Sequence, residues 1–175
     1  MKKFELTNEF ITNMFGTKLF RIRALVEFGD VEAGELGGYV EKESNLGHDD
    51  NAWVYDNAWV YGDAQVSGDA LVYDNAWVYG NALVYGNALV CGDARVCGDA
   101  RVCGNGDYAY AHGFGSVNRT TTFFRLKDGG VGVRCGCFYG TLAQFRDKIR
   151  ETHGETKKAQ EYLMLADLMK LRFEK

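Results

Sequence analysis

The chain of 175 residues contains no proline and only three histidines. Without proline, tight turns have to rely on Gly, Asn and Asp, which tolerate positive φ. No apolar run follows Met1, and no stretch approaches the length that crosses a bilayer. We therefore expect a cytoplasmic protein with no membrane partner.

Five cysteines, an odd number, predict reduced thiols and no disulfide framework. Cys91, Cys97 and Cys103 are expected to point outward from three different faces. Cys135 and Cys137 would put two sulfurs on one side of a strand, which is half of a typical zinc site. We expect no bound metal. The chain also lacks a phosphate loop, a dinucleotide fingerprint and a nucleophile motif, so no cofactor is expected.

Charge is unevenly distributed along a chain whose formal net charge is −4. Residues 49–100 contain eight acidic residues and one basic residue, Arg95. Residues 119–175 contain twelve basic and seven acidic residues. Proteins that bind nucleic acids usually show a strong basic footprint, so no DNA duplex is expected as a partner.

The chain is organised around a six-residue unit that repeats nine times without interruption from Asn51 to Gly104. Ala and Val recur two places apart in every unit, and a pair such as Gly80-Asn81 separates one unit from the next. Because side chains alternate along a strand, Ala and Val lie on one face, and each pair can turn the chain. A short strand and a corner at a strict period are typical of a parallel β-helix.

These units resemble the hexapeptide repeat of left-handed β-helices, whose triangular coils contain three hexads each. The resemblance implies three full coils in which residues eighteen apart stack at about 4.8 Å. The left hand is implied by the resemblance alone. Hexapeptide-repeat enzymes also suggest a homo-oligomer, with a trimer as the first expectation.

We predict three regions, namely an N-terminal hairpin (1–33), the β-helix (34–117, regular hexads 51–104) and a C-terminal appendage (118–175). Leu46 and Val40 lie six and twelve residues before Ala52, so an irregular first coil is expected there. The appendage should contain a hairpin over 123–135 and two α-helices. A capping box at Thr141 and Gln144 predicts that the first helix starts at Leu142. The second helix is expected over about 155–171.

The outward positions of the hexads are rich in aromatic residues on two of the three faces. Such stacks exceed the few hundred Å² that a monomer normally exposes, so something should cover them. Subunit contacts or the ends of the chain are one explanation. A ligand platform is the other, in which Trp77 and Arg95 provide stacking and cation–π contacts to a ring. The candidate residues on these faces are Trp53, Trp59, Tyr61, Trp77, Tyr79, Arg95 and Arg101.

Basic and hydroxyl residues gather after the β-helix, including Asn118, Arg119 and Arg125. They could be a solvated hairpin edge whose charges prevent edge-to-edge pairing. They could also form a small anion pocket, for example for a phosphate. We include them among the candidate ligand or interface residues.

Two activities of hexapeptide-repeat enzymes depend on histidine. Acyltransferases that use coenzyme A generally place a histidine base between subunits. Carbonic anhydrase chemistry needs three histidines that bind one zinc ion. None of His48, His112 and His153 lies in the regular hexads. His153 is explained by its place at a helix C-terminus. If the protein is an enzyme, His112 is the candidate catalytic residue.

Three segments together resemble small hexapeptide-repeat proteins of bacteriophages and prophages: GELGGYVEKESNL, NAWVYDNAWVYGDA and GSVNRTTTFFRLKDGG…CGCFYGTLAQF. The family is largely uncharacterised, and it implies a β-helix in a phage or bacterial cytosolic setting. We expect a non-catalytic oligomer, in the host cytoplasm if phage-encoded, that sequesters or inhibits a host defence protein or a small nucleotide-like signal. The alternatives are an acyltransferase-like enzyme with its site at a subunit interface and a structural polymer of stacked coils.

Overall fold

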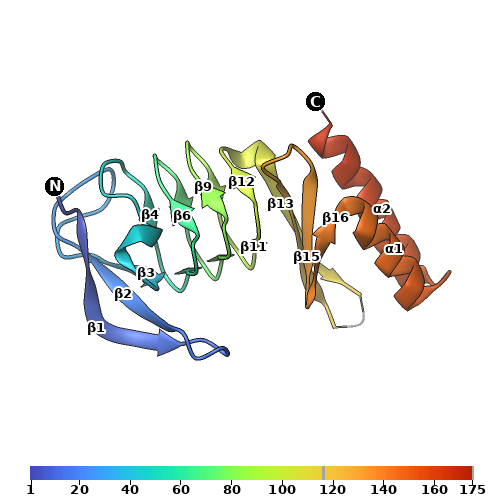
Figure 1. Ribbon diagram of the computed structural model, residues 1–175, viewed down its shortest axis with the longest axis horizontal. Helices are drawn as coiled ribbons and strands as arrows, with labels where there is room; N and C mark the ends of the chain where they lie inside the picture. Colours follow the sequence, from blue (N-terminus) through green and yellow to red (C-terminus); the bar gives the residue numbers. More distant parts are fainter. Residues whose placement is uncertain (116, 175) are drawn as a thin grey trace.

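The repeat units form two-residue strands that coil around a common core (Figure 1). The computed structural model describes residues 1–115 and 117–174. Parallel pairing joins the strands into rows in the orders β3-β5-β8-β11, β4-β7-β10 and β6-β9-β12. The chain is therefore mainly β and contains a β-solenoid of about four turns. The solenoid strands are β3 (Leu36–Val40), β4 (Trp53–Val54), β5 (Trp59–Val60), β6 (Gln65–Val66), β7 (Leu71–Val72), β8 (Trp77–Val78), β9 (Leu83–Val84), β10 (Leu89–Val90), β11 (Arg95–Val96) and β12 (Arg101–Val102).

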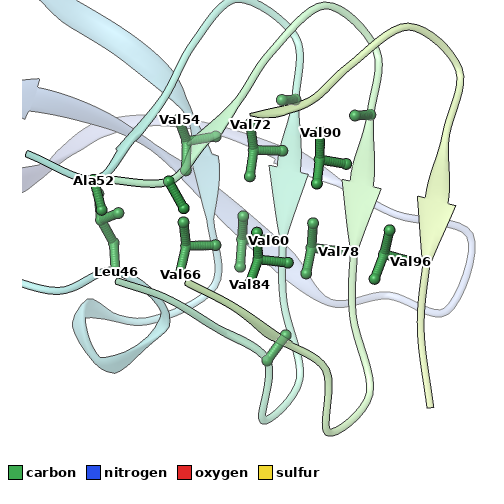
Figure 2. Packing of buried hydrophobic residues seen from close by; sticks show 14 of the residues in the cluster. Leu46, Ala52, Val54, Val60, Val66, Val72, Val78, Val84, Val90 and Val96 are labelled. Atoms are coloured by element: carbon green, nitrogen blue, oxygen red, sulfur yellow. The ribbon is translucent and has the colours of Figure 1, made fainter. Parts of the chain in front are cut away.

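Stacking in the regular coils follows the period of the sequence. Trp59 pairs with Trp77, which pairs with Arg95, so residues eighteen apart lie in register. The Ala and Val of each regular unit are fully buried, and Figure 2 shows the valines in rows along the solenoid. Full burial of one valine side chain contributes about 1.5–3 kcal/mol to stability, and each further valine in a row adds a similar contribution.

The corners are sharp because one residue of each turn pair adopts a left-handed conformation. In most units this residue is a glycine, such as Gly80 with φ +71°. Asp56 and Asp74 occupy the same place with φ of 52° and 59°. Asp is among the few side chains that tolerate this region, so the turn pairs of the sequence account for the corners.

The first coil differs from the predicted register. Val40 pairs with Val60 and Leu46 bridges to Val66, a separation of twenty residues in each case (60 − 40 and 66 − 46). The prediction that Val40 and Leu46 occupy the same position of the repeat as Ala52 is therefore wrong. Both occupy valine positions, because the corner after Leu46 is two residues longer than a regular one.

An antiparallel hairpin of β1 (Phe4–Thr12) and β2 (Lys18–Ala24) precedes the coil. Gly16, with φ +83°, lies in the turn that joins the two strands. β2 also pairs with β3, so the hairpin extends the row of β3, β5, β8 and β11 into a six-stranded sheet. The hairpin lies at the N-terminal end of the solenoid, and its tip points along the coil (Figure 1).

The C-terminal region contains a four-stranded antiparallel sheet where a two-stranded hairpin was predicted. Its strands are β13 (Tyr108–Phe114), β14 (Arg119–Arg125), β15 (Val131–Cys135) and β16 (Phe138–Thr141). β13 was missed because its sequence, YAYAHGF, alternates tyrosine with alanine and not with polar residues. The predicted boundary at 117/118 lies between β13 and β14, which pair with each other.

Two C-terminal helices, α1 (Leu142–His153) and α2 (Lys157–Phe173), confirm the predicted pair. The capping box is also confirmed, since Thr141 N donates to Gln144 Oε1 at 2.8 Å and Gln144 N donates to Thr141 Oγ1 at 3.3 Å. Phe123 and Val133 pack with both helices in a second core. The sheet therefore lies between the last coil and the helices (Figure 1).

Side chains cover the carbonyls at the N-terminal edge of the first regular coil. Lys3 Nζ donates to the carbonyl oxygens of Asp50 (2.7 Å) and Ala52 (2.8 Å). Asn45 Nδ2 donates to the carbonyl oxygens of Gly62 (3.1 Å) and Ala64 (2.8 Å). These donors explain why the polar side chains of Lys3 and Asn45 are buried.

Acceptor side chains cover the amides at the opposite edge, on the last coil. The backbone N–H groups of Leu89, Arg95 and Cys103 each donate to a side-chain oxygen. The acceptors are Asn105 Oδ1 (2.8 Å), Thr122 Oγ1 (2.9 Å) and Asp107 Oδ2 (3.0 Å). Both solenoid edges are thus blocked against strand pairing with another chain.

Candidate functional site

A groove of about 730 Å³ lies on the face formed by β5, β8 and β11. Solenoid residues form its floor, the tip of the β1–β2 hairpin forms one wall, and the C-terminal sheet forms the other. Its volume lies within the range of small-molecule sites, about 300–1,000 Å³. The groove is lined by Met14, Phe15, Tyr61, Trp77, Tyr79, Asp93, Arg95, Arg119, Thr120, Arg134, Gly136 and Cys137.

Two stacked columns build the floor. The rings of Trp59 and Trp77 lie 4.3 Å apart with an interplanar angle of 8°, and the Arg95 guanidinium lies 3.7 Å from the Trp77 centroid. Beside them, the rings of Tyr61 and Tyr79 lie 5.0 Å apart at 2°. The in-register pairing of successive coils places these flat groups one above the other. Trp59 supports the first column without lining the groove.

The groove carries a positive charge although the protein as a whole is acidic. Arg95, Arg119 and Arg134 line it, and Asp93 is the only acidic residue in the lining. Arg134 lies 6.0 Å from the Tyr79 ring centroid, and its Nε atom is buried without a hydrogen-bond partner. Within residues 1–115 and 117–174, none of these three arginines forms a salt bridge. Their charge is therefore free to attract an anion.

Arg119 reaches the groove by crossing the turn between β15 and β16. A Cβ atom added to Gly136 would collide with Arg119 Nη1. Gly136 also has φ +58°, a conformation that suits glycine. The turn therefore needs glycine for both its own backbone and the passage of the arginine.

The hairpin tip supplies an apolar wall. Met14 and Phe15 line the groove and are 82% and 79% exposed. Large apolar side chains at such exposure are candidates for contact with a ligand or another protein. Their position opposite Arg119 and Arg134 gives the groove one apolar wall and one cationic wall.

The floor tyrosines remain neutral at physiological pH. Burial raises the pKa of Tyr61, and burial together with the neighbouring Cys97 raises the pKa of Tyr79. Burial also raises the pKa of the Cys97 thiol, whose side chain is only 2% exposed. Cys97 follows Val96 at the outward position next to Tyr79, and neighbouring side chains cover it there.

Five of the residues predicted from sequence meet in the groove: Tyr61, Trp77, Tyr79, Arg95 and Arg119. Trp53 does not, since it is fully buried beneath Phe4 and Phe28, whose ring centroids lie 6.2 and 5.3 Å away. The N-terminal segment of the same chain thus covers the first residue of the first aromatic face. Trp53 is a core residue.

Three other predicted residues have structural contacts elsewhere. Arg101 Nη1 donates to the carbonyl oxygens of Asn81 (3.0 Å) and Ala100 (2.8 Å). Arg125 Nη2 donates to the Phe173 carbonyl at 3.0 Å, which ties α2 to the sheet. Asn118 has φ +48° and lies in the turn between β13 and β14.

His112 lies outside the groove lining, on β13. Its Nδ1 atom is 2.9 Å from Thr120 Oγ1, and Thr120 lines the groove. Among the residues that the structure describes, no group of three or more His, Cys, Asp or Glu is placed to hold a metal ion. Cys135 ends β15 while Cys137 follows the Gly136 turn, so the prediction that they share one side of a strand is wrong.

Met14 and Phe15 were not predicted from the sequence as site residues. Arg134 belongs to the basic and hydroxyl group after the β-helix, for which an anion pocket and a solvated hairpin edge were both left open. Met14 and Phe15 follow the first strand at a hairpin turn, and two adjacent large apolar residues in a turn are a usable signal. Nothing in the local pattern indicates that this turn faces the C-terminal sheet.

The comparisons with known proteins concern the repeats. The family model of the YdcK beta solenoid repeat matches residues 64–80 and 76–92. No curated protein matches the chain. None of the described helices has the length and apolar character needed to cross a membrane. The matched residues include β6–β10. The family match and the parallel pairing of these strands therefore both indicate that the centre of this chain is a β-solenoid repeat.

Proposed function

We propose that this protein binds and sequesters a small, anionic, ring-containing ligand of the nucleotide class, without chemistry. The observation that carries the proposal is the groove in which Trp77 and Arg95 stack beside two further unpaired arginines. Aromatic and guanidinium planes stack on nucleobases, and arginine forks bind phosphate oxygens. The groove combines both kinds of contact.

We further propose a setting in which such binding has a purpose. The protein is a phage-encoded, left-handed hexapeptide-repeat protein that acts in the host cytoplasm by removing a host signal or blocking a host defence protein. This part of the proposal is supported by the resemblance of its first-coil, repeat and C-terminal segments to phage proteins. A homo-oligomer, with three subunits, is proposed on the same resemblance and on the exposed apolar side chains Met164, Leu168 and Leu171 of α2.

The two alternative functions receive less support. An acyltransferase-like activity would use His112, which does not line the groove. A structural polymer would need open coil ends, whereas Lys3, Asn45, Asn105, Thr122 and Asp107 occupy the edge groups. A discrete oligomer fits these capped edges better than a filament.

Native mass spectrometry tests the proposal on the protein as purified from cells. We expect an oligomer with a small anionic passenger that is lost on denaturation. Calorimetric titration of stripped, refolded protein with ADP should then show binding that weakens in Arg95→Ala. Lys157→Ala is the matched control, because this lysine is exposed on α2 and outside the groove. Absence of a passenger together with no binding of adenine, guanine, cytosine or uracil nucleotides would refute the proposal.

A further inference from the structure

A second cavity of about 250 Å³ lies between the C-terminal sheet and the helices. It faces the side of the sheet that is turned away from the solenoid. Its lining includes Arg119, Cys137, Phe145, Lys148, His153 and Tyr162.

The two cavities share Arg119 and Cys137. Arg119 stands at the start of β14, one of the two inner strands of the sheet, close to the turn that joins β15 and β16. Its guanidinium passes over Gly136 and borders both spaces. One unpaired cation is thus available to an anionic group that lies between them.

The second cavity offers ring contacts and another cation. The rings of His153 and Tyr162 lie 5.9 Å apart at 24°, and Phe145 meets Tyr162 edge-on at 5.8 Å. Lys148 contributes an amine from α1, which is about half exposed and forms a salt bridge with Glu151 Oε2 at 2.9 Å. These groups suit an aromatic ring with a polar edge.

Size argues against an independent second ligand. Cavities that hold a whole small molecule usually measure about 300–1,000 Å³, and this one falls below that range. The groove on the other side of Arg119 lies well within it. The smaller space is better suited to one ring of a ligand whose remainder occupies the groove.

We propose that the two cavities form one bipartite site for a ligand with two ring systems joined by an anionic linkage, the chemistry of a dinucleotide. One ring packs against the edges of Trp77 and Tyr79 on the groove floor, because Trp59 and Arg95 occupy the two faces of Trp77. The phosphodiester lies at Arg119, and the second ring enters the space beside His153. This inference rests on the proposed function, since it specifies the ligand class of the same groove. Joining two ring contacts in one molecule raises affinity because the second contact becomes intramolecular.

Calorimetric titration with two probes, AMP and the dinucleotide ApA, tests the inference. We expect the intact protein to bind ApA at least about tenfold more tightly than AMP. ApA carries less negative charge than AMP, so charge alone cannot produce this order. Lys148→Ala and His153→Ala should each reduce the advantage of ApA while AMP affinity stays unchanged. Lys157→Ala is the control for loss of one helix lysine outside both cavities.

The outcomes separate the inference from the proposed function. If AMP binds as tightly as ApA, or if Lys148→Ala weakens both probes equally, the bipartite site is refuted. The groove proposal survives that result when Trp77→Ala weakens both probes. If neither probe binds the intact protein, the bipartite site is refuted, and the groove proposal is then decided by the passenger and the other nucleotides named above. Circular dichroism melting of each variant excludes unfolding as the cause of lost binding.

Discussion

The guanidinium of Arg95 stacks on Trp77 with its central carbon 3.7 Å from the indole centroid. Trp77 in turn stacks on Trp59, so a cation closes a column of two indoles. The three residues are successive members of one row, and the next group along the axis is the C-terminal sheet, bonded through Arg95 N and Thr122 Oγ1. The cation is therefore held by its backbone and its ring partner, and its charge remains available to a ligand.

Removing either member of this pair should weaken binding without unfolding the coil. We expect Trp77→Ala to cost about 1–3 kcal/mol of ADP binding free energy, the range for loss of one stacking ring. Arg95→Ala should cost about 0.5–2 kcal/mol, as expected for a lost cation–π and anion contact. Arg95→Lys tests planarity, because lysine keeps the charge and loses the stack. Unchanged calorimetric affinities in both alanine variants would exclude the groove floor as the binding surface.

Gly136→Ala should weaken ligand binding in the same way as a substitution of Arg119 itself. The added Cβ forces Arg119 away from the turn, so ADP affinity should fall nearly as far as in Arg119→Ala. The positive φ of +58° adds about 1 kcal/mol of destabilisation. Gly129→Ala is the matched control, with φ +84° and no atom within 4 Å of the new Cβ. Equal affinities in the two variants would show that the position of Arg119 is unimportant.

The buried hydrogen bonds of Asn45 should stabilise the protein more than the exposed hydrogen bond of Asn51 does. Asn45→Ala removes the donor to the carbonyls of Gly62 and Ala64, and we expect the free energy of unfolding to fall by at least about 2 kcal/mol. Asn51→Ala removes an exposed bond to Asp69 Oδ1 at 2.8 Å and should cost no more than about 0.5 kcal/mol. Urea denaturation of both variants measures the difference. Similar losses of unfolding free energy in the two variants would mean that water replaces the hydrogen bonds of Asn45.

Lys3 should give the protein a distinctive pH dependence. Burial lowers the pKa of Lys3 to about 8 from its ordinary value near 10.5, against the opposing effect of Asp50 and Asp49. Between these two values the unfolded chain binds more protons than the folded chain, so the contribution of Lys3 to stability increases with pH. Below pH 8 the amine is charged in both the folded and the unfolded chain, so the cost of burying that charge lowers the free energy of unfolding most.

Comparison with Lys3→Met isolates this effect, because the raised pKa values of the tyrosines and Cys97 are common to both proteins. We expect the difference in unfolding free energy, wild type minus variant, to rise from pH 8 to pH 10 by at most about 1.4 kcal/mol per pH unit. Urea denaturation at pH 7, 8, 9 and 10 measures it. A difference that stays constant or falls with pH would show that Lys3 keeps its ordinary pKa when folded.

Much of the solenoid could be predicted from the sequence because its contacts follow the repeat. A strand of two residues and a corner of four place Trp59, Trp77 and Arg95 in one row, without knowledge of the distant chain. The capping box at Thr141 likewise depends on residues three apart, and α1 starts where it predicts. The register of the first coil was missed because a longer corner follows Leu46.

Tertiary structure alone decided which outer positions are buried and which form a site. Trp53 and Trp59 occupy equivalent places in their units, yet Phe4 and Phe28 cover only the former. Arg119 and Arg134 reach the floor because β13–β16 dock on the last coil through side chains that satisfy its open amides. Local period determines contacts between neighbouring coils, whereas contacts between segments far apart in the chain depend on how both solenoid ends are capped. The sequence thus determined the rows of the β-solenoid, and the docking of its two terminal segments made a groove from one of them.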